Sequence, residues 1–438
     1  MRIPILYGKS TLDVTFPAGC VPTIIRKRPM PILDDPAAAI ADSLASPVSS
    51  PPLREAARGA QSACILICDI TRPVPNALFL QPLIRELLDA GVPASGITVL
   101  VATGLHRPND GNELLELVGD PWVLNTVTVA NHYARDDDAH VHLGRTPRGT
   151  VVRLDRRLVE ADIRIATGLV EPHFMAGWSG GRKVIAPGVA HAETITTFHN
   201  AAFMAHPLAT NCVLDGNPLH EEQLAIIGML GGALALNTVI DEGRRLAFVN
   251  FGEIVASHLA AVAFVRTYAE VSVDRRYRTV VTSSAGYPLD NTYYQTVKGM
   301  VGPLGILAPG GDLIIASACT EGMGSTHYVE AQRRLLALGE SGFLANIERK
   351  SHADIDEWQT QMQLRTTRVG KVHLYSAGLS QSDGALTGVT RIDSLEDAIA
   401  ASILRHKDQH VAVIPEGPYV VPMIQGHAAE LTHMPTRS

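Results

Sequence analysis

The chain has 438 residues, of which 46% are hydrophobic and 18% charged, and its formal net charge at pH 7 is −7. This composition is typical of a compact folded protein and excludes a disordered chain. The negative charge argues against a partner that needs a basic surface, such as nucleic acid or an anionic membrane. The length is sufficient for two or three ordinary domains with filled cores.

The five cysteines are few, odd in number and scattered along the chain. This pattern favours free thiols in a reducing cytosol over a disulfide framework. Cys64 and Cys68 lie in an apolar, β-branched run, so we interpret them as small buried hydrophobic residues rather than metal ligands. The N-terminal run MRIPILYGKS soon becomes polar, unlike a signal peptide, and the apolar runs are too short to span a bilayer. We therefore expect a cytoplasmic protein.

Short apolar runs alternate with helical patterns in the first part of the chain. The predicted elements are strand 62–68, helix 76–90, strand 97–102, helix 113–118, strand 126–130 and strand 162–166. This alternation indicates βαβ units, and hence a mostly parallel sheet with helices on both faces. A proline-rich segment, residues 45–52, is predicted as a loop before this series.

A second series begins after a predicted helix over residues 253–268. Its elements are strand 279–283, helix 293–304, strand 312–316, helix 393–406 and strand 410–414. We therefore predict an α/β protein of two domains with mostly parallel sheets, residues 1–271 and 272–414, with the active site in the cleft between them. The tail, residues 415–438, is expected to pack back on the first domain.

Two polar clusters follow predicted strands of the first series. Asp69 and Arg72 come directly after one strand, with Thr71 between them. An acid and an arginine at this spacing are able to fix one another and reach an anionic ligand; the alternative is a strand-end salt bridge. His106 follows the next strand and a glycine that lets the backbone turn. A general acid or base is natural there, and an ordinary surface histidine is the alternative.

The most informative cluster follows the strand predicted at residues 162–166. It contains Glu171-Pro172-His173, then Ser179-Gly180-Gly181-Arg182-Lys183, then Pro187-Gly188. Consecutive glycines allow close backbone approach, and their amides are able to cradle a phosphate. Lys183 is a charge partner or, with a lowered pKa, a nucleophile. Val184 follows it, so the segment does not match a P-loop. His199 and His206 are candidate metal ligands, although no HExxH or CxxC spacing supports zinc.

A fourth cluster lies on the helix predicted at residues 293–304. Tyr294 and Lys298 share a helix face, with Gln295 alongside. An amide and an ammonium group placed in this way are able to hold a small carboxylate. The alternative is a solvated helix face.

Taken together, these clusters resemble the nickel-dependent lactate racemase family. The matching pieces are Asp69-x-Thr71-Arg72-Pro73, Gly104-x-His106-Arg107, EPHFMAGWSGGRK from Glu171 to Lys183, His199, YPLDNTYYQTVK from Tyr287 to Lys298, and Trp358. They span most of the chain, and the Glu171–Lys183 segment is highly specific to this family. The resemblance implies a racemase or epimerase of a 2-hydroxyacid that works by reversible hydride transfer through a 2-keto acid.

The resemblance also implies a cofactor, the nickel pincer nucleotide, which is a pyridinium mononucleotide with two sulfur-containing arms. Lys183 matches the lysine that links covalently to one arm, and His199 matches the protein ligand to nickel. Soft sulfur donors with one imidazole suit square-planar nickel. We further infer that the glycine-rich stretch beside Lys183 cradles the phosphate; its residues are Ser179, Gly180, Gly181 and Arg182.

Site roles follow from the same resemblance. His106 and His173 would exchange the hydroxyl proton, one for each enantiomer, and Asp69 and Arg72 would set the polarity of the site. The expected substrate-binding residues are Tyr294, Gln295, Lys298 and Trp358. A substrate with a second carboxylate would need a further cation, for which Arg107 and Arg182 are both candidates.

The expected partners are a small 2-hydroxyacid and the enzymes that make the cofactor. Lactate, dicarboxylic, aromatic and sugar acids all remain open as substrates. The main alternative function is a divalent-metal-dependent hydrolase or lyase that uses the same histidines. A dehydrogenase is disfavoured because no dinucleotide fingerprint is found, and a cofactor carrier without turnover would leave His106 and His173 dispensable.

Overall fold

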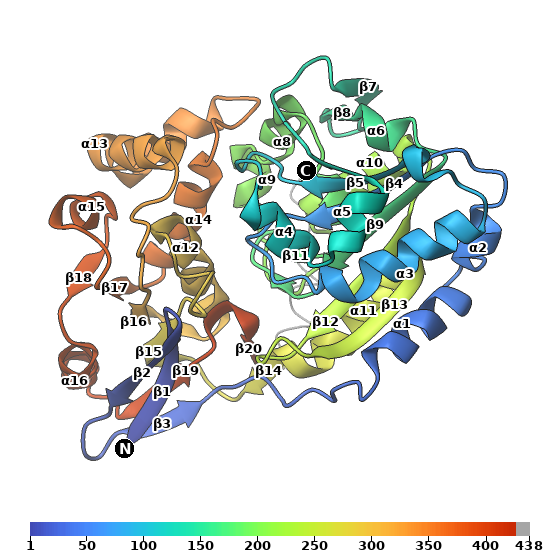
Figure 1. Cartoon of the computed structure of the whole chain (residues 1–438). Coiled ribbons are helices and arrows are strands. Elements are labelled where there is room, and N and C mark those ends of the chain that lie inside the picture. The colour runs from blue at the N-terminus through green and yellow to red at the C-terminus, as the bar shows by residue number, and fades with distance from the viewer. Residues whose placement is uncertain (426–438) are drawn as a thin grey trace.

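Two six-stranded sheets form the framework of the protein, which the computed structural model describes from residue 1 to residue 425 (Figure 1). In the first half the strand order is β13-β12-β9-β4-β5-β6. All neighbours in this sheet run parallel except the β12–β13 pair. The strands are β4 (Ala63–Cys68), β5 (Ile97–Ala102), β6 (Thr128–Asn131), β9 (Ile163–Leu169), β12 (Leu234–Ile240) and β13 (Leu246–Glu253).

Helices cover both faces of this sheet because successive side chains of its buried strands point to opposite sides. In β4, Ile65 and Ile67 pack against one helical layer, whereas Cys64 and Leu66 join the core on the other side. The first layer consists of α1 (Pro36–Ala45), α2 (Leu53–Ala56), α3 (Asn76–Asp89), α4 (Asn112–Val118) and α5 (Pro121–Thr126). The second contains α6 (Arg156–Val159), α7 (Arg182–Ile185), α8 (Ala192–Phe198), α9 (Ala201–Ala205) and α10 (Pro218–Leu230).

The second half has a fully parallel sheet in the order β18-β17-β16-β15-β19-β3. Its strands are β3 (Val21–Ile24), β15 (Tyr277–Ser283), β16 (Leu307–Ala316), β17 (Lys371–Tyr375), β18 (Thr390–Ile392) and β19 (His410–Ile414). One face packs on the hairpin β1 (Arg2–Tyr7)–β2 (Ser10–Thr15) and on α16 (Leu395–His406). The other face is covered by α12 (Tyr293–Val301) and α14 (Glu357–Thr367). The remaining helices of this half are α13 (Thr326–Glu348) and α15 (Gln381–Leu386).

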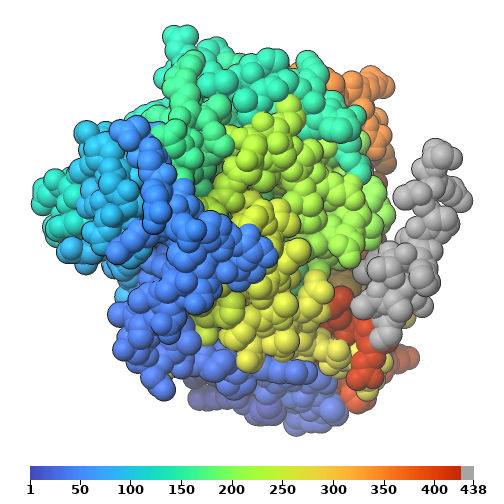
Figure 2. Space-filling view, turned by 90° about the vertical axis from the view of Figure 1, so that its right-hand side faces the viewer, coloured from blue at the N-terminus to red at the C-terminus, as the bar shows by residue number. Residues whose placement is uncertain are grey.

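The N-terminal segment lies in the second half, unlike the division expected from the sequence. β3 pairs with β19, and the chain then crosses to the first half, where α1 packs beside β13 (Figure 2). Hydrophobic periodicity is a local signal and does not say which sheet a short strand joins. At the other end, β20 (Val421–Ile424) pairs with β14 (Glu270–Val273), which follows α11 (Ile254–Ala269). Residues 426–438 of the predicted tail lie outside the described residues.

The predicted α/β class with mostly parallel sheets is confirmed. The predicted elements of the two series are present, with ends shifted by a few residues; the helix predicted at residues 293–304 ends as α12 at Val301 and continues as a short 3-10 turn. The pattern missed the hairpin β7 (His140–Arg145)–β8 (Val151–Asp155) and the pair β12–β13. It also gave no prediction for strands β1 to β3, β17 and β18 or for helices α13 and α14. All five cysteines are free, as predicted. Within residues 1–425, no helix combines the length and the hydrophobicity needed to cross a membrane.

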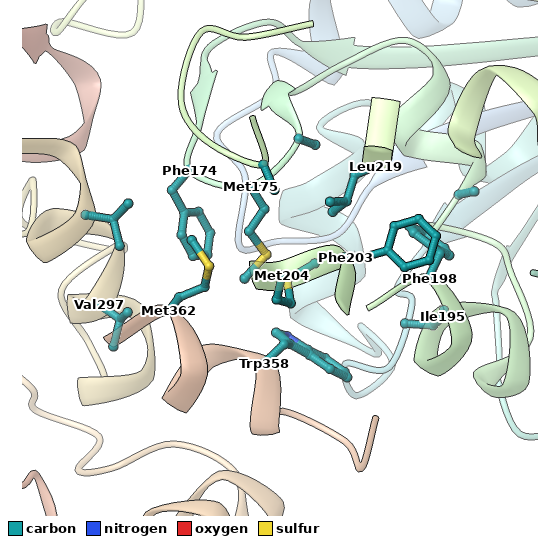
Figure 3. Close-up of a cluster of buried hydrophobic side chains, with 14 of the residues drawn as sticks. Phe174, Met175, Ile195, Phe198, Phe203, Met204, Leu219, Val297, Trp358 and Met362 are labelled. Atoms are coloured by element: carbon teal, nitrogen blue, oxygen red, sulfur yellow. The ribbon is translucent and has the colours of Figure 1, made fainter. Parts of the chain in front are cut away.

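One apolar core joins the two halves. Phe174 and Met175 of the first half share a buried cluster with Val297 of α12 and with Trp358 and Met362 of α14 (Figure 3). Close packing of such side chains leaves little room for relative movement without loss of contact. The seam therefore holds the two halves in one relative position.

A buried carboxylate stabilises the second half. Asp312, fully buried in β16, accepts hydrogen bonds from Ser402 and Arg405 of α16 and lies 3.0 Å from a ring nitrogen of both His373 and His406. Burial opposes its ionisation, but these donors hold the pKa of Asp312 below its usual value. Its contribution to stability is therefore present at neutral pH and is lost as the pH falls through the lowered pKa.

We expect Asp312→Ala to lower the free energy of unfolding by about 2 kcal/mol, because it removes the buried acceptor shared by Ser402, Arg405 and two largely buried histidines. Denaturant titration at pH 7 measures this change. Glu330→Ala, which removes an exposed carboxylate near Arg333 on α13, is the matched control and should cost less than about 1 kcal/mol. An Asp312→Ala variant as stable as the control would contradict this role.

Candidate active site

A cavity of about 170 Å³ lies between the two halves. On one side it is lined by the loops that follow β4, β5 and β9, at the carboxyl ends of parallel strands where sites in α/β sheets usually form. On the other side it is lined by α12 and the start of α14. Twelve residues predicted from the sequence meet there: Asp69, Arg72, His106, His173, Ser179, Gly180, Lys183, His199, Tyr294, Gln295, Lys298 and Trp358.

Two residues predicted for the cofactor site do not line this cavity. Gly181 packs against the ring of His258, and the Arg182 guanidinium lies 3.0 Å from the same ring, fully buried. Because neighbouring residues of a helix project about 100° apart, α7 directs Lys183 toward the cavity and Arg182 away from it. Of the four residues predicted to cradle the phosphate, only Ser179 and Gly180 therefore line the cavity.

His106 is oriented by Asp69. The Nδ1 atom of His106 lies 2.6 Å from Oδ2 of Asp69, and the Thr71 hydroxyl donates to Oδ1 of the same carboxylate at 2.6 Å. Desolvation opposes the charge on His106, but the Asp69 carboxylate outweighs it and raises the pKa of His106 above its usual value. This pair leaves Nε2 of His106 available for proton transfer.

The pKa of His173 is shifted in the opposite direction to that of His106. It lies in the small hairpin β10 (Pro172–His173)–β11 (Gly177–Trp178), where its Nδ1 accepts from the backbone N–H groups of Met175 and Ala176 at 3.3 and 3.1 Å. Burial and the positive charges of Lys183 and Arg72 hold the pKa of His173 well below its usual value. The ring is therefore neutral, with its hydrogen on Nε2.

Lys183 is brought to the cavity by a loop that needs glycine. Gly180 has φ +79°, and a Cβ there would lie 2.7 Å from Val170 Cγ2 and 3.2 Å from the Leu169 carbonyl oxygen. Without that Cβ, the loop packs on the end of β9. Desolvation and the nearby Arg72 lower the pKa of Lys183 to about 8. A substantial fraction of the amine is neutral, and therefore nucleophilic, near physiological pH.

His199 caps the C-terminal end of α8 as a neutral imidazole. Its Nδ1 donates to the Ile195 carbonyl oxygen at 2.8 Å, and burial lowers the pKa of His199 to about 4. Nε2 keeps its lone pair, and the ring lies against Trp358 with centroids 5.0 Å apart. A neutral imidazole fixed through its other nitrogen is the form that binds metal ions.

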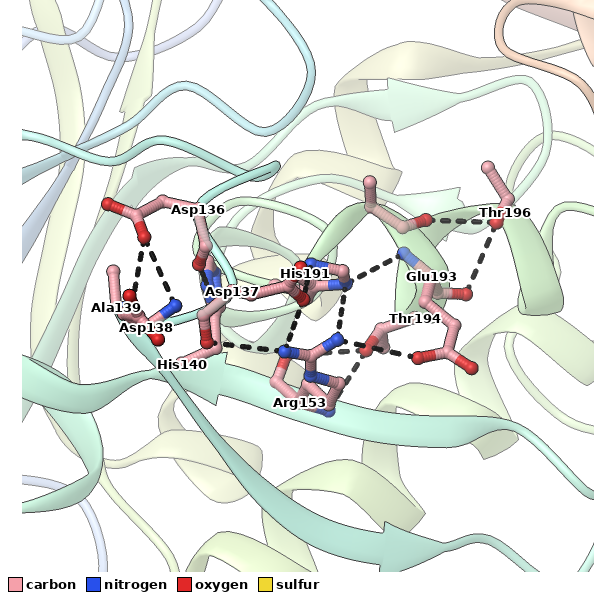
Figure 4. Close-up of polar contacts among 12 residues, drawn as sticks. Asp136, Asp137, Asp138, Ala139, His140, Arg153, His191, Glu193, Thr194 and Thr196 are labelled. Atoms are coloured by element: carbon pink, nitrogen blue, oxygen red, sulfur yellow. Dashed lines mark hydrogen bonds and ion pairs between the residues drawn. The ribbon is translucent and has the colours of Figure 1, made fainter.

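The helix that carries His199 is anchored to the β7–β8 hairpin (Figure 4). The Arg153 backbone N–H donates to the Thr194 hydroxyl at 2.9 Å, and the Arg153 side chain pairs with Asp137 at 2.7 Å. His191 caps the start of α8 by accepting from the Glu193 N–H at 3.1 Å. These contacts fix α8 at its N-terminal end, so that His199 at its C-terminal end has a defined position.

The second half contributes the wall of the cavity that carries Tyr294, Gln295 and Lys298. The Tyr294 carbonyl oxygen accepts from Gln359 at 2.5 Å, and its hydroxyl accepts from Trp358 Nε1 at 3.3 Å, which ties α12 to α14. Desolvation and the positive charge of Arg72 hold the pKa of Lys298 well below its usual value. No carboxylate among residues 1–425 lies within ion-pair distance of Lys298, so a bound anion would relieve this cost.

Two lining residues with ionisable side chains were not predicted as site residues: Cys68, interpreted from the sequence as a small buried hydrophobic residue, and Asp356. Asp356 precedes α14 with a left-handed backbone (φ +64°) and accepts from the Ser325 hydroxyl. The resemblance marked Trp358 two residues later, but no charge or spacing pattern marked Asp356 itself, because its neighbours across the cavity are distant in sequence. Among the described residues, no three His, Cys, Asp or Glu side chains are grouped so as to hold a metal ion, as the hydrolase alternative would require.

Comparison with known proteins gives consistent matches over both halves. The model of the lactate racemase N-terminal domain matches residues 7–211, and that of the C-terminal domain matches residues 274–422. A lactate racemase of Thermoanaerobacterium thermosaccharolyticum is 30% identical over 96% of this chain and 99% of its own length. A lactate racemase of Lactiplantibacillus plantarum is 33% identical over 65% of this chain and 67% of its own.

The fold agrees with these matches. The structure of the lactate racemase apoprotein from Thermoanaerobacterium thermosaccharolyticum superposes with a TM-score of 0.87. The sequence identity is 28%, and the match covers 96% of this chain and all of that chain.

The lowered pKa of Lys183 is open to a direct test in protein produced without any cofactor supply. In trace acetylation followed by peptide mass spectrometry, we expect half-maximal reactivity of Lys183 near pH 8. The exposed Lys371 serves as the internal reference. Arg72→Gln removes a positive charge and should move the Lys183 midpoint to higher pH. Identical midpoints for the two lysines would refute an activated Lys183.

Proposed function

The chain belongs to the lactate racemase family, and we propose that it racemises or epimerises a 2-hydroxyacid with a nickel pincer nucleotide attached to Lys183. One observation carries the proposal. A lysine with a lowered pKa, a neutral histidine held through Nδ1 and a carboxylate-oriented histidine line one cavity beside a cation without an ion-pair partner among residues 1–425. The first two fit attachment of the cofactor, and the last two fit the substrate.

The donor set suits this cofactor. The neutral amine of Lys183 is prepared for covalent attachment, and Nε2 of His199 would complete a nickel site whose other donors are soft. Gly180 lets the loop before Lys183 pack closely on Val170 and Leu169, where a Cβ would not fit. When bound, the group would take a hydride from C2 of the substrate and return it. Separate biosynthetic enzymes would have to supply it.

Proton transfer falls to the two imidazoles. His106 would accept the hydroxyl proton at Nε2, and Asp69 would stabilise the resulting imidazolium. His173 carries its hydrogen on Nε2 and would donate a hydrogen bond to the C2 oxygen, which would orient and polarise it. Since the hydroxyl points in opposite directions in the two enantiomers, two such groups are needed. At rest one ring is prepared to accept and the other to donate.

The wall from the second half would orient the substrate. Lys298, with Gln295 and Tyr294 beside it, would hold the carboxylate, and Arg72 is already paired with Glu171 at 2.8 Å. Trp358 closes the apolar side of the cavity. Exclusion of water strengthens these electrostatic contacts and protects the 2-keto acid while it remains bound.

Production together with the cofactor-making enzymes tests the proposal. We expect a sulfur-rich nucleotide adduct on Lys183, about one nickel per chain, and interconversion of the enantiomers of lactate or a related acid. Lys183→Ala should lack the adduct, as peptide mass spectrometry would show. An unmodified Lys183 without nickel, despite a working cofactor supply, would favour the metal-dependent hydrolase instead.

The Asp69–His106 pair predicts a pH dependence. His106 accepts a proton only when deprotonated, so kcat/KM should rise with pH through the raised pKa of His106. Asp69→Asn should shift this rise to lower pH and reduce the plateau on the order of 10²-fold or more. Glu113→Gln, which removes a carboxylate paired with the exposed Arg107, is the control. It should change neither the pH at which kcat/KM rises nor the height of the plateau. An unchanged profile in Asp69→Asn would remove this pair from the mechanism.

A further inference from the structure

The cavity has three cationic side chains besides its histidines, and only one of them is available to a substrate carboxylate. Arg72 is engaged by Glu171 at 2.8 Å. Lys183 is the proposed attachment point and would lose its charge in an amide-like link. Lys298 remains, with no carboxylate of residues 1–425 within ion-pair distance. This inventory matches a ligand with a single negative charge.

The two arginines left open by the sequence do not add to this inventory. Arg107 is exposed and forms a bidentate pair with Glu113, at 2.6 and 2.8 Å. Arg182 is buried against His258. Neither lines the cavity. A second carboxylate on the substrate would therefore meet no cation from either residue.

Instead, the cavity presents a carboxylate of its own. Asp356 lines it at the start of α14, with Oδ2 bonded to the Ser325 hydroxyl. The charge of Asp356 acts on groups from both halves. Burial is the largest cause of the raised pKa of Tyr294, and the charge of Asp356 is the second largest. The same charge contributes to the raised pKa of His106. Like charges in a poorly solvated space repel strongly.

Much of the remaining wall is apolar, although Thr103 and Gln359 also line it. The apolar part includes Leu105, Leu169, Phe174, Met175, Ile195 and Trp358. Such a surface accommodates an uncharged substituent and gives no compensation for the desolvation of a second carboxylate.

Resting on the proposed function, we propose that this site takes monocarboxylic 2-hydroxyacids with an uncharged side chain, and that Asp356 is the residue that rejects dicarboxylic acids. Lys298 supplies the single positive charge for the substrate carboxylate. Asp356 supplies the negative charge that a second carboxylate would have to approach.

Lactate and malate give the sharpest comparison, because malate differs by a carboxylate on the methyl carbon. With cofactor-loaded protein, we expect kcat/KM for malate to be at least on the order of 100-fold below that for lactate. Asp356→Asn keeps the shape of the side chain and its acceptor for Ser325 but removes the charge. It should raise the malate-to-lactate ratio on the order of tenfold.

Asp354→Asn is the matched control. It removes a charge from the same loop, but Asp354 is exposed, lies outside the cavity and is neutralised by Arg334 at 2.9 Å and Lys350 at 2.8 Å. The ratio should not change in this variant. An equal rise in both variants would show a loop effect and overturn the assignment to Asp356.

The outcomes separate this inference from the function on which it rests. Comparable rates for malate and lactate in the unchanged protein would overturn the inference and leave the racemase intact. If neither acid is interconverted although Lys183 carries the adduct, the proposed racemisation of these acids is wrong. Equilibrium titration of the same preparation then decides selectivity: tighter binding of lactate supports it, and binding of malate as tight as lactate or tighter overturns it.

Discussion

The apolar seam between the two halves is the contact on which the site depends. Phe174 and Met175 pack there with Val297, Trp358 and Met362. Phe174 and Met175 also line the cavity from the first half, and Trp358 lines it from the second. The proton-transfer and cofactor-binding candidates come from one half, whereas the carboxylate-binding candidates come from the other. Loss of packing at the seam would therefore separate the two sets of groups, even if each sheet remained folded.

The electrostatics of the cavity follow from crowding cations in a place with little water. Desolvation lowers the pKa of Lys183, Lys298, His173 and His199 alike, and the charge of Arg72 adds to this effect on the first three of them. At Lys183 and His199 this favours the neutral nitrogen atoms needed for nucleophilic attack and metal binding, whereas at Lys298 it favours pairing with a bound anion. His106 is the exception, because Asp69 shifts its pKa in the opposite direction.

Rigid elements position each of these groups. His106 and Asp69 follow strands β5 and β4, and Lys183 follows a glycine turn packed on the end of β9. His199 ends a helix that the β7–β8 hairpin holds through Arg153. Tethering by sheet ends and anchored helices keeps the reacting groups in place without a ligand, which reduces the reorganisation required on binding.

The sequence by itself determined the local elements and most of the candidate site. Buried strands such as β4 and β5 and the amphipathic helix α3 follow from hydrophobic period, and the run around Lys183 is distinctive enough to indicate its chemistry. Only the tertiary structure decided that β3 joins the second sheet, that Arg182 turns away from Lys183, and that Asp356 lies across the cavity from His106. The reason is physical: period and motif report on neighbours within a few residues, whereas these placements depend on contacts between segments far apart in the chain.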